Sequence, residues 1–143
     1  MRLPALVLIC LGVAACQNAA APSVEVSDAV CRPTPNGRDL TGCYMTLIAT
    51  TDDRLVSAST AAAGKAEIHA VSTEGGVMTM SEMAGGLPLP AGQATALRPG
   101  GNHLMLMQVT APLADGDTVE LALTFEDAPP ITVSARVGNP AVN

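Results

Sequence analysis

Hydrophobic and polar residues alternate along much of the chain, and this period of two predicts β-strands rather than helices. From Val119 to Phe125 every second residue is apolar, and Glu120 and Thr124 lie between them. The same alternation runs from Ile131 to Val137. Strands of this kind bury one face and leave the other to water.

Seven further segments have strand character. They are residues 24–32, 43–50, 54–60, 65–71, 77–83, 94–98 and 103–110. Turn-forming residues such as Gly75-Gly76 and Pro99-Gly100-Gly101 separate them. We expect an exposed loop at Pro88-Leu89-Pro90, because proline cannot donate to the hydrogen-bond ladder of a central strand. Many short, regularly spaced strands predict an all-β fold, an antiparallel Greek-key sandwich or barrel.

The first residues predict an export signal. Arg2 supplies a positive charge, an apolar run follows from residue 3 to residue 13, and small residues precede Cys16. This run is too short to cross a bilayer as a helix, which takes about 20 residues. Val13-Ala14-Ala15-Cys16 resembles a bacterial lipobox, which implies that Cys16 is lipidated. The alternative is ordinary cleavage after Ala15, which leaves a free thiol.

We therefore expect a signal peptide at residues 1–15, a lipidated cysteine and flexible tether at 16–23, and one β-domain at 24–143. The lipid would be the only membrane attachment, because no later apolar stretch is long enough to span a bilayer. Gln17 beside the lipidated cysteine favours the outer membrane under the usual Gram-negative sorting preference. The sequence thus predicts a periplasmic protein anchored to a membrane by its lipid.

The charge balance excludes several classes of function. The chain carries 13 acidic residues against 7 lysines and arginines, a formal net charge of −6 at pH 7. No basic patch is present to neutralise phosphates, so we expect no nucleic-acid partner. No nucleophile with a paired base is recognisable, so we do not expect enzymatic activity. We expect the protein to be a monomer.

Beyond the signal and the lipidation candidate Cys16, two cysteines remain, Cys31 and Cys43. An even pair in an exported protein is interpreted first as a disulfide. Each lies in a predicted strand, with the turn-forming residues 33–37 between them. The alternative is a redox-active or copper-binding thiol pair, but the spacing is unlike Cys-x-x-Cys and neither cysteine adjoins a histidine.

Both histidines of the chain are followed by methionines. Of the 7 methionines, five lie close after a histidine: Met78, Met80 and Met83 after His69, and Met105 and Met107 after His103. Thioether and imidazole without a nearby thiolate favour Cu(I), and zinc sites rarely use thioether. The alternative is that the methionines fill the core and that the histidines are unrelated core residues.

Strand geometry allows these residues to meet. Side chains two apart on a strand share a face, so His103 and Met105 project together, and so do Met78 and Met80. If the two strands are neighbours, His69 can complete a site of two imidazoles and two thioethers. We expect Met80 to lie near the surface. Four neutral donors would hold Cu(I) in a redox-quiet, exchangeable site that suits a carrier.

We also expect Met105 to lie near the surface. The remaining methionines of the two segments, Met78, Met83 and Met107, are expected to pack around the site, and Met78 is the one that could replace Met80 as a ligand. Met107 continues the row of side chains that begins with His103 and Met105.

Three segments resemble the PCuAC family of periplasmic copper chaperones. They are Glu67-Ile68-His69 with Gly75-Gly76-Val77-Met78-Thr79-Met80, residues 97–107 and residues 115–126. The family motif is a His, ten residues, a Met, about twenty-one residues and then His-x-Met. His69 and Met80 are separated by ten residues, and His103-Leu104-Met105 supplies the end, after a middle gap one residue longer. The similarity runs from about residue 28 to residue 137.

The resemblance implies a cupredoxin-like Greek-key β-sandwich that binds Cu(I). The implied ligands are His69, Met80, His103 and Met105, with Met78 and Met107 as secondary candidates. It implies delivery of copper to the CuA centre in subunit II of cytochrome c oxidase, with a Sco-type copper protein as the other candidate partner. The chain shows no His/Met-rich C-terminal segment of the kind many members carry, so we do not expect a second copper site.

Two other functions stay open at this point. Periplasmic copper buffering or resistance would use the same ligands without an oxidase as recipient. An electron-transfer cupredoxin is less favoured, because that class needs a thiolate beside two imidazoles, and no cysteine lies near either histidine in the sequence.

Overall fold

The computed structural model of the protein describes residues 20–141. Within this range the secondary structure is ten β-strands without a helix, which confirms the predicted all-β class. The described residues accordingly contain no helix long and apolar enough to span a membrane. The expected signal peptide, the lipidation site at Cys16 and the start of the tether lie outside the described residues, so these remain predictions.

The strands follow one another closely along the chain. They are β1 (Val24–Cys31), β2 (Leu40–Ala49), β3 (Asp53–Ser59), β4 (Ala63–Glu74), β5 (Val77–Glu82), β6 (Leu87–Leu89), β7 (Ala94–Leu97), β8 (His103–Val109), β9 (Thr118–Phe125) and β10 (Ile131–Val137). They form one sheet in the order β5-β4-β8-β2-β1-β10-β9-β3-β6, and β7 pairs with the part of β2 beyond β8. Of these pairings only β1 with β10 is parallel.

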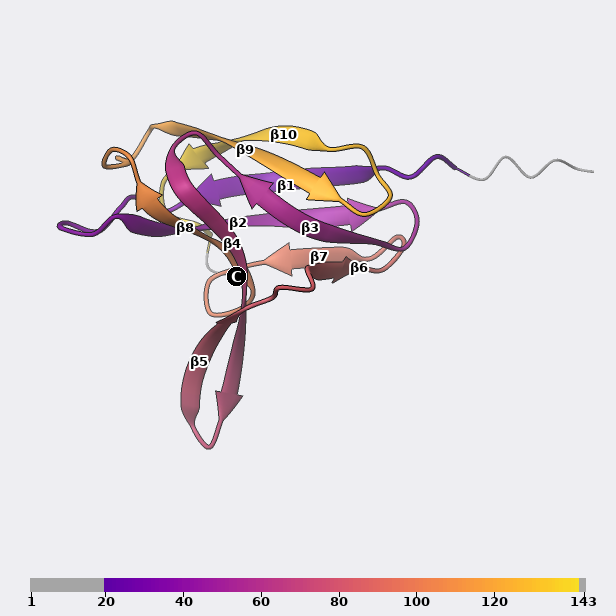
Figure 1. The fold of residues 1–143 in the computed structure, drawn as a ribbon, viewed down its shortest axis with the longest axis horizontal. Helices are drawn as coiled ribbons and strands as arrows, with labels where there is room; N and C mark the ends of the chain where they lie inside the picture. Colours follow the sequence, from indigo (N-terminus) through magenta and orange to yellow (C-terminus); the bar gives the residue numbers. More distant parts are fainter. Residues whose placement is uncertain (1–19, 142–143) are drawn as a thin grey trace, which may run out of the picture.

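The sheet curls into a sandwich (Figure 1), and an apolar core fills its interior. The alternation predicted for residues 119–125 is realised, because Val119, Leu121, Leu123 and Phe125 are buried and the residues between them are exposed. Most of the core is aliphatic, since the chain has one tyrosine, one phenylalanine and no tryptophan. Complete burial of a leucine side chain contributes roughly 1.5–3 kcal/mol. The largest fully buried side chains are Leu47, Leu55, Leu89, Leu104, Leu106, Leu121 and Leu123.

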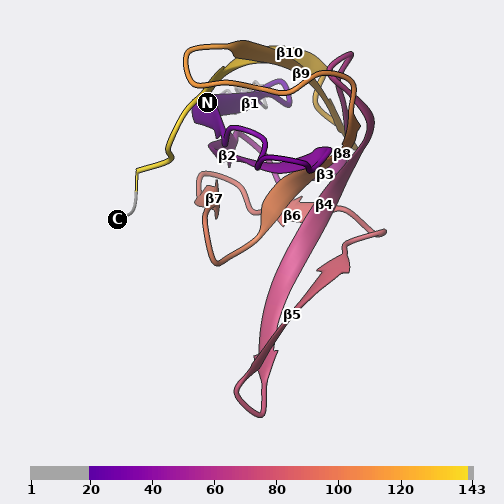
Figure 2. The ribbon, with the colours of Figure 1, turned by 90° about the vertical axis from the view of Figure 1, so that its left-hand side faces the viewer.

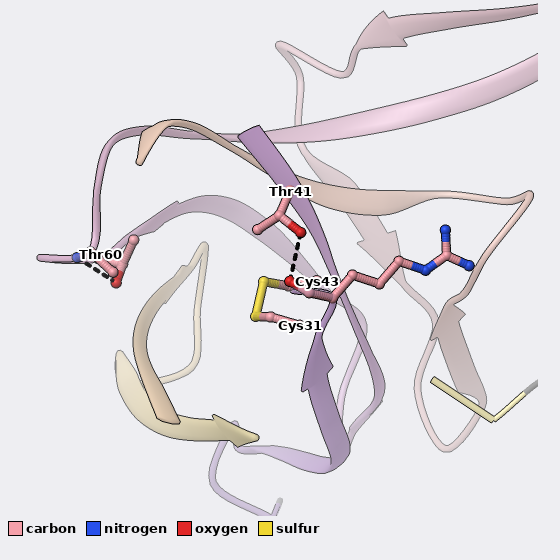
Figure 3. The surroundings of a disulfide bond; sticks show 6 residues. Cys31, Thr41, Cys43 and Thr60 are labelled. Carbon is pink, nitrogen blue, oxygen red and sulfur yellow. Dashed lines mark hydrogen bonds between the residues drawn. A yellow bond between two sulfur atoms is a disulfide. The ribbon is translucent and has the colours of Figure 1, made fainter. Parts of the chain in front are cut away.

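A disulfide joins the first two strands. Cys31 of β1 lies directly opposite Cys43 of β2, and their sulfur atoms are bonded in the core (Figure 3). Beside them the Thr41 hydroxyl donates a hydrogen bond of 2.7 Å to the carbonyl oxygen of Arg32 (Figure 3). With both sulfurs bonded to each other, neither cysteine is available as a metal-binding thiolate.

The expected loop at Pro88 is instead an edge strand. β6 pairs with β3, Leu87 and Leu89 are buried, and Pro88 between them is exposed. An edge strand has one unpaired side, so it tolerates a proline that lacks an N–H group. The prediction of an exposed loop was therefore wrong, because alternating burial matters more than the proline at a sheet edge.

The hairpin of β4 and β5 projects away from the sandwich (Figure 2). Its turn is Gly75-Gly76, with φ angles of 58° and 80°, values that glycine adopts without steric cost and that favour a tight two-residue hairpin. All six residues of β5 are exposed. Strand β4 thus belongs to the sandwich at its first half and to the projecting hairpin at its second.

Candidate metal centre

The pairing of β4 with β8 brings the two histidines together. His69 lies directly opposite His103, and Glu67 lies directly opposite Met105. Directly opposite side chains of an antiparallel pair lie on the same face of the sheet. The centroids of the two imidazole rings are 5.7 Å apart, with 62° between their planes. Backbone pairing alone therefore places both rings side by side.

The pairing of β4 with β5 brings the exposed methionines to the same face. Met80 is opposite Val71 and Met78 is opposite Thr73. Val71 and Thr73 lie two and four residues after His69 on β4, so they share its face. The four predicted ligands, His69, Met80, His103 and Met105, therefore all lie on one face of the β5-β4-β8 part of the sheet.

The opposite face of the same strands belongs to the core. Ile68 of β4 and Leu104 and Leu106 of β8 alternate with the residues of the site and are buried. A shift of one residue in this pairing would send the apolar side chains to the site and the histidines into the core. Core packing therefore fixes the position of the candidate ligands on β4 and β8.

His103 is held in a defined orientation. Its side chain is buried, and its Nδ1 lies 2.9 Å from the carbonyl oxygen of Gly101. A carbonyl oxygen can only accept, so Nδ1 must donate its proton, and Nε2 of the neutral ring keeps an electron pair. That electron pair is what a metal ion requires.

Tyr44 packs beside His103 on the side of β2. The centroids of their rings are 6.3 Å apart, and the Arg32 guanidinium lies 5.5 Å from the centroid of the Tyr44 ring. Gly42, directly opposite Met105, makes room for this tyrosine, because a Cβ atom there would be 2.8 Å from its hydroxyl oxygen. The buried aromatic ring thus supports the imidazole from β2.

His69 has one nitrogen engaged and one without a partner. Its Nε2 lies 2.8 Å from Oε2 of Glu67, whereas its Nδ1 is buried and has no hydrogen-bond partner in the described part of the chain. A buried nitrogen without a partner is costly by about 1–3 kcal/mol. A soft cation bound at this nitrogen would satisfy it, so the residues fit a copper ion.

Glu67 is ionised beside this histidine. Its side chain is only 10% exposed and also forms an ion pair with Lys65. The hydrogen bonds from Lys65 and then from His69 hold the pKa of the Glu67 carboxyl below its ordinary value. The same ion pair raises the pKa of the Lys65 ammonium.

The ligand types narrow the choice of metal. Within residues 20–141, no three His, Cys, Asp or Glu side chains are grouped so as to hold a metal ion. The methionines on the same face offer thioether sulfur beside the two histidines, which zinc rarely accepts and Cu(I) prefers.

The methionines differ in exposure. Met80 is 58% exposed, in line with its expected place near the surface, and Met105 and Met107 are half-buried. Met83 is partly buried against the core, but Met78 is 60% exposed, so the expectation that it packs beside the site was wrong. Neither face of β5 is covered by another layer, and its methionines therefore stay in solvent.

Sequence reasoning missed Glu67 and Tyr44 as members of the site. Glu67 precedes His69 by two residues, so strand alternation was sufficient to place both on one face. Tyr44 gave no such signal, because its proximity to His103 depends on the pairing of β2 with its neighbours.

A family model described as "Putative lipoprotein LpqE-like" matches residues 24–137. The chain belongs to the LpqE-like family. A protein of Leifsonia xyli subsp. xyli (strain CTCB07) described as "Putative lipoprotein Lxx21020" is 37% identical over 83 residues, which is 58% of this chain and 50% of that protein. The matched region thus spans half the length of this curated relative.

Solved structures with the same fold include PCuAC domains. The "Copper-bound PCuAC domain from PmoF2" superimposes with a TM-score of 0.69 at 23% identity, covering 85% of this chain and 97% of that domain. The "Solution structure of apo-DR1885 from Deinococcus radiodurans" gives a TM-score of 0.60 at 29% identity, covering 96% of this chain and 94% of that one. The copper(I) form of the latter protein gives 0.59 at 28% identity, with coverages of 87% and 80%. The resemblance to the PCuAC family and the β-sandwich fold are thereby confirmed.

Proposed function

We propose that this protein is a copper chaperone that binds Cu(I) through His69, Met80, His103 and Met105. The observation that carries the proposal is the pairing of β4 with β8 and β5, which puts these four side chains on one face. Two similar solved structures support it, because their descriptions name bound copper and CuI. The unpartnered Nδ1 of His69 gives further support, since it is a buried electron pair without a proton donor.

The different exposure of the donors suits transfer of the ion. The imidazoles are largely buried, with 6% exposure for His103, whereas Met80 stands on the projecting hairpin. An incoming ligand can bind copper from the side of this exposed thioether before the imidazoles leave. Neutral donors stabilise Cu(I) without adding charge, and this favours a carrier over a redox centre.

An electron-transfer cupredoxin is disfavoured by the disulfide. Such a centre needs a cysteine thiolate with two imidazoles, and both cysteines of the described region are bonded to each other. Addition of Cu(II) is therefore expected to give no intense blue absorption band. A strong thiolate band would favour the cupredoxin over the chaperone.

We further propose a periplasmic protein, anchored by a lipid on Cys16, that delivers copper to the CuA centre of cytochrome c oxidase subunit II or to a Sco-type protein. The lipoprotein descriptions of its family and of its relative support the anchor. Copper buffering is the second candidate. Gln17 favours it, because an outer-membrane anchor would hold the protein away from an inner-membrane oxidase.

Anaerobic titration with Cu(I) in competition with a chromophoric chelator tests the proposal. The purified protein is expected to bind one Cu(I), and X-ray absorption should count two nitrogen and two sulfur neighbours. Replacement of His103 by Ala should weaken binding by about a hundredfold or more, because loss of a ligand exceeds the 10–100-fold effect of losing a supporting contact.

Met83→Ala is the matched control, since Met83 follows the same hairpin but packs against the core. Its affinity for Cu(I) should stay close to that of the unmodified protein. Equal losses in both variants would contradict the ligand assignment, and absence of stoichiometric binding would overturn the proposed function.

A further inference from the structure

We infer that Glu67 is a positioning residue that selects the donor nitrogen of His69, so that His69 binds copper through Nδ1 while His103 binds it through Nε2. The inference rests on the proposed function and deepens it. It adds a residue that the ligand motif does not contain, and it makes the two imidazoles chemically distinct.

The hydrogen bond between Glu67 and His69 has a defined direction. The Glu67 side chain forms an ion pair with Lys65, an ordinary glutamate carboxyl is ionised at neutral pH with or without such a partner, and an ionised carboxylate can only accept hydrogen bonds. Nε2 of His69, 2.8 Å away, must therefore carry the proton. In the neutral ring Nδ1 is then unprotonated, and this is the atom that is buried without a partner.

His103 differs from His69 in which ring nitrogen is engaged by the protein. Its Nδ1 donates to the carbonyl oxygen of Gly101, so its free nitrogen is Nε2. Each ring thus has one nitrogen fixed by the protein and the other available. The two available nitrogens are of different type, although the residues are directly opposite each other in the sheet.

The neighbours of Glu67 allow it to hold the ring of His69. It lies between Lys65 and His69 on one face of β4 and directly opposite Met105 of β8. Its side chain is largely shielded from solvent, so the hydrogen bond to His69 is weakened little by competing water. A carboxylate that accepts a hydrogen bond from a ligating histidine fixes the ring and raises its basicity, an effect worth 10–100-fold in metal affinity.

The tautomer of His69 can be measured without metal. Long-range ¹H–¹⁵N correlation spectra of the copper-free protein should show one tautomer, protonated at Nε2. In Glu67→Ala the ring should populate both tautomers. In Lys65→Ala, the matched control, the Nε2-protonated form should persist, because the carboxylate remains. An unchanged tautomer in Glu67→Ala would overturn the inference.

The same spectra identify the copper-bound nitrogens. On addition of Cu(I), the resonances of Nδ1 in His69 and of Nε2 in His103 should undergo the large metal-induced shifts. A metal-induced shift at Nε2 of His69 would overturn the inference even if both variants folded poorly, because this measurement uses the unmodified protein.

Affinity measurements complete the test. Glu67→Ala should weaken Cu(I) binding by 10–100-fold. Glu67→Gln should recover part of the loss, since its amide oxygen still accepts the hydrogen bond, and Lys65→Ala should stay within about threefold. A Glu67→Ala protein with unchanged affinity and an intact fold by amide spectra would contradict the inference. If the unmodified protein bound no Cu(I), the proposed function would fail, while the metal-free spectra would still report whether Glu67 sets the tautomer.

Discussion

Two antiparallel hairpins of the protein use apolar residues for different purposes. In the β9–β10 hairpin every second residue of β9, from Val119 to Phe125, is a large apolar residue buried in the core. In the β4–β5 hairpin every residue of β5 is exposed, including Val77 at 63% and Met80 at 58%. Apolar side chains contribute to folding only when they leave water. The buried side chains of β9 therefore stabilise the fold. The exposed side chains of β5 contribute little to stability and remain accessible from solvent.

The largest expected effect is the loss of stability from a buried residue of the β9–β10 hairpin, compared with an exposed residue of the β4–β5 hairpin. Leu121→Ala, in β9, should lower the free energy of unfolding by about 2–5 kcal/mol, because it removes a fully buried side chain and leaves a cavity. Met78→Ala, in β5, is the matched control and should change it by less than about 0.5 kcal/mol. Urea denaturation followed by circular dichroism measures both, and similar losses would contradict the comparison.

The disulfide contributes the next largest effect. Cys31→Ser with Cys43→Ser should lower the free energy of unfolding by about 3 kcal/mol, the loop-closure value for a bond across 12 residues. Because the bond lies in the sandwich and away from the projecting hairpin, the affinity for Cu(I) of the folded double variant should be unchanged. A tenfold loss of affinity in a folded variant would place the cysteines in the copper chemistry.

Asp53, at the start of β3, is hydrogen-bonded to backbone groups of the sandwich. Its carboxylate accepts hydrogen bonds from the backbone N–H groups of Arg54, Glu126, Asp127 and Ala128. Burial opposes ionisation, but these four donors outweigh it and hold the pKa of Asp53 below its ordinary value. The stabilisation is therefore complete above the unfolded-state pKa and is lost as the pH falls through the folded-state pKa.

Asp53→Asn should therefore cost about 1–3 kcal/mol at neutral pH, since four backbone N–H groups lose a charged acceptor. The difference in unfolding free energy between the two proteins should shrink as the pH falls below about 4, the ordinary range of an aspartate. Denaturation curves between pH 7 and pH 2.5 measure it. A difference that grew on acidification would show that the sign is wrong.

The smallest expected effect concerns the exposed side of β5. Val77→Thr keeps a β-branched side chain and should alter the free energy of unfolding by no more than about 0.5 kcal/mol. Thermal unfolding should show an unchanged midpoint. A large decrease would mean that the hairpin packs against the sandwich, contrary to its exposure.

The strands of the sandwich were predictable because alternation is a property of each segment alone. Nine of the ten strands lie where the pattern of residues places them, and β6 was missed because two prolines concealed a short run of alternating burial. The closure of the sheet, with β1 parallel to β10, depends on contacts between distant segments and has no local signal.

The identity of the candidate ligands was predictable from the chemistry of imidazole and thioether. Which of them share a face within one strand was predictable from the alternation of side chains. Their meeting across strands was not, because the sequence does not reveal that His69 pairs with His103 rather than with a neighbour. That pairing is set by core residues such as Ile68 and Leu104, which point away from the site. The exposure of Met78 was misjudged for a related reason, since no sequence signal shows that β5 extends beyond the sandwich.

The direct pairing of His69 with His103 has a consequence for repeated use of the protein. Small zinc domains fold only as the ion arrives, so an ion that departs takes the structure with it. Here the backbone pairing of β4 with β8 places the two rings opposite each other through contacts of the protein itself. If copper binds there as we propose, an emptied molecule is expected to keep its shape and to be ready for the next ion, so that one molecule can be loaded and unloaded repeatedly.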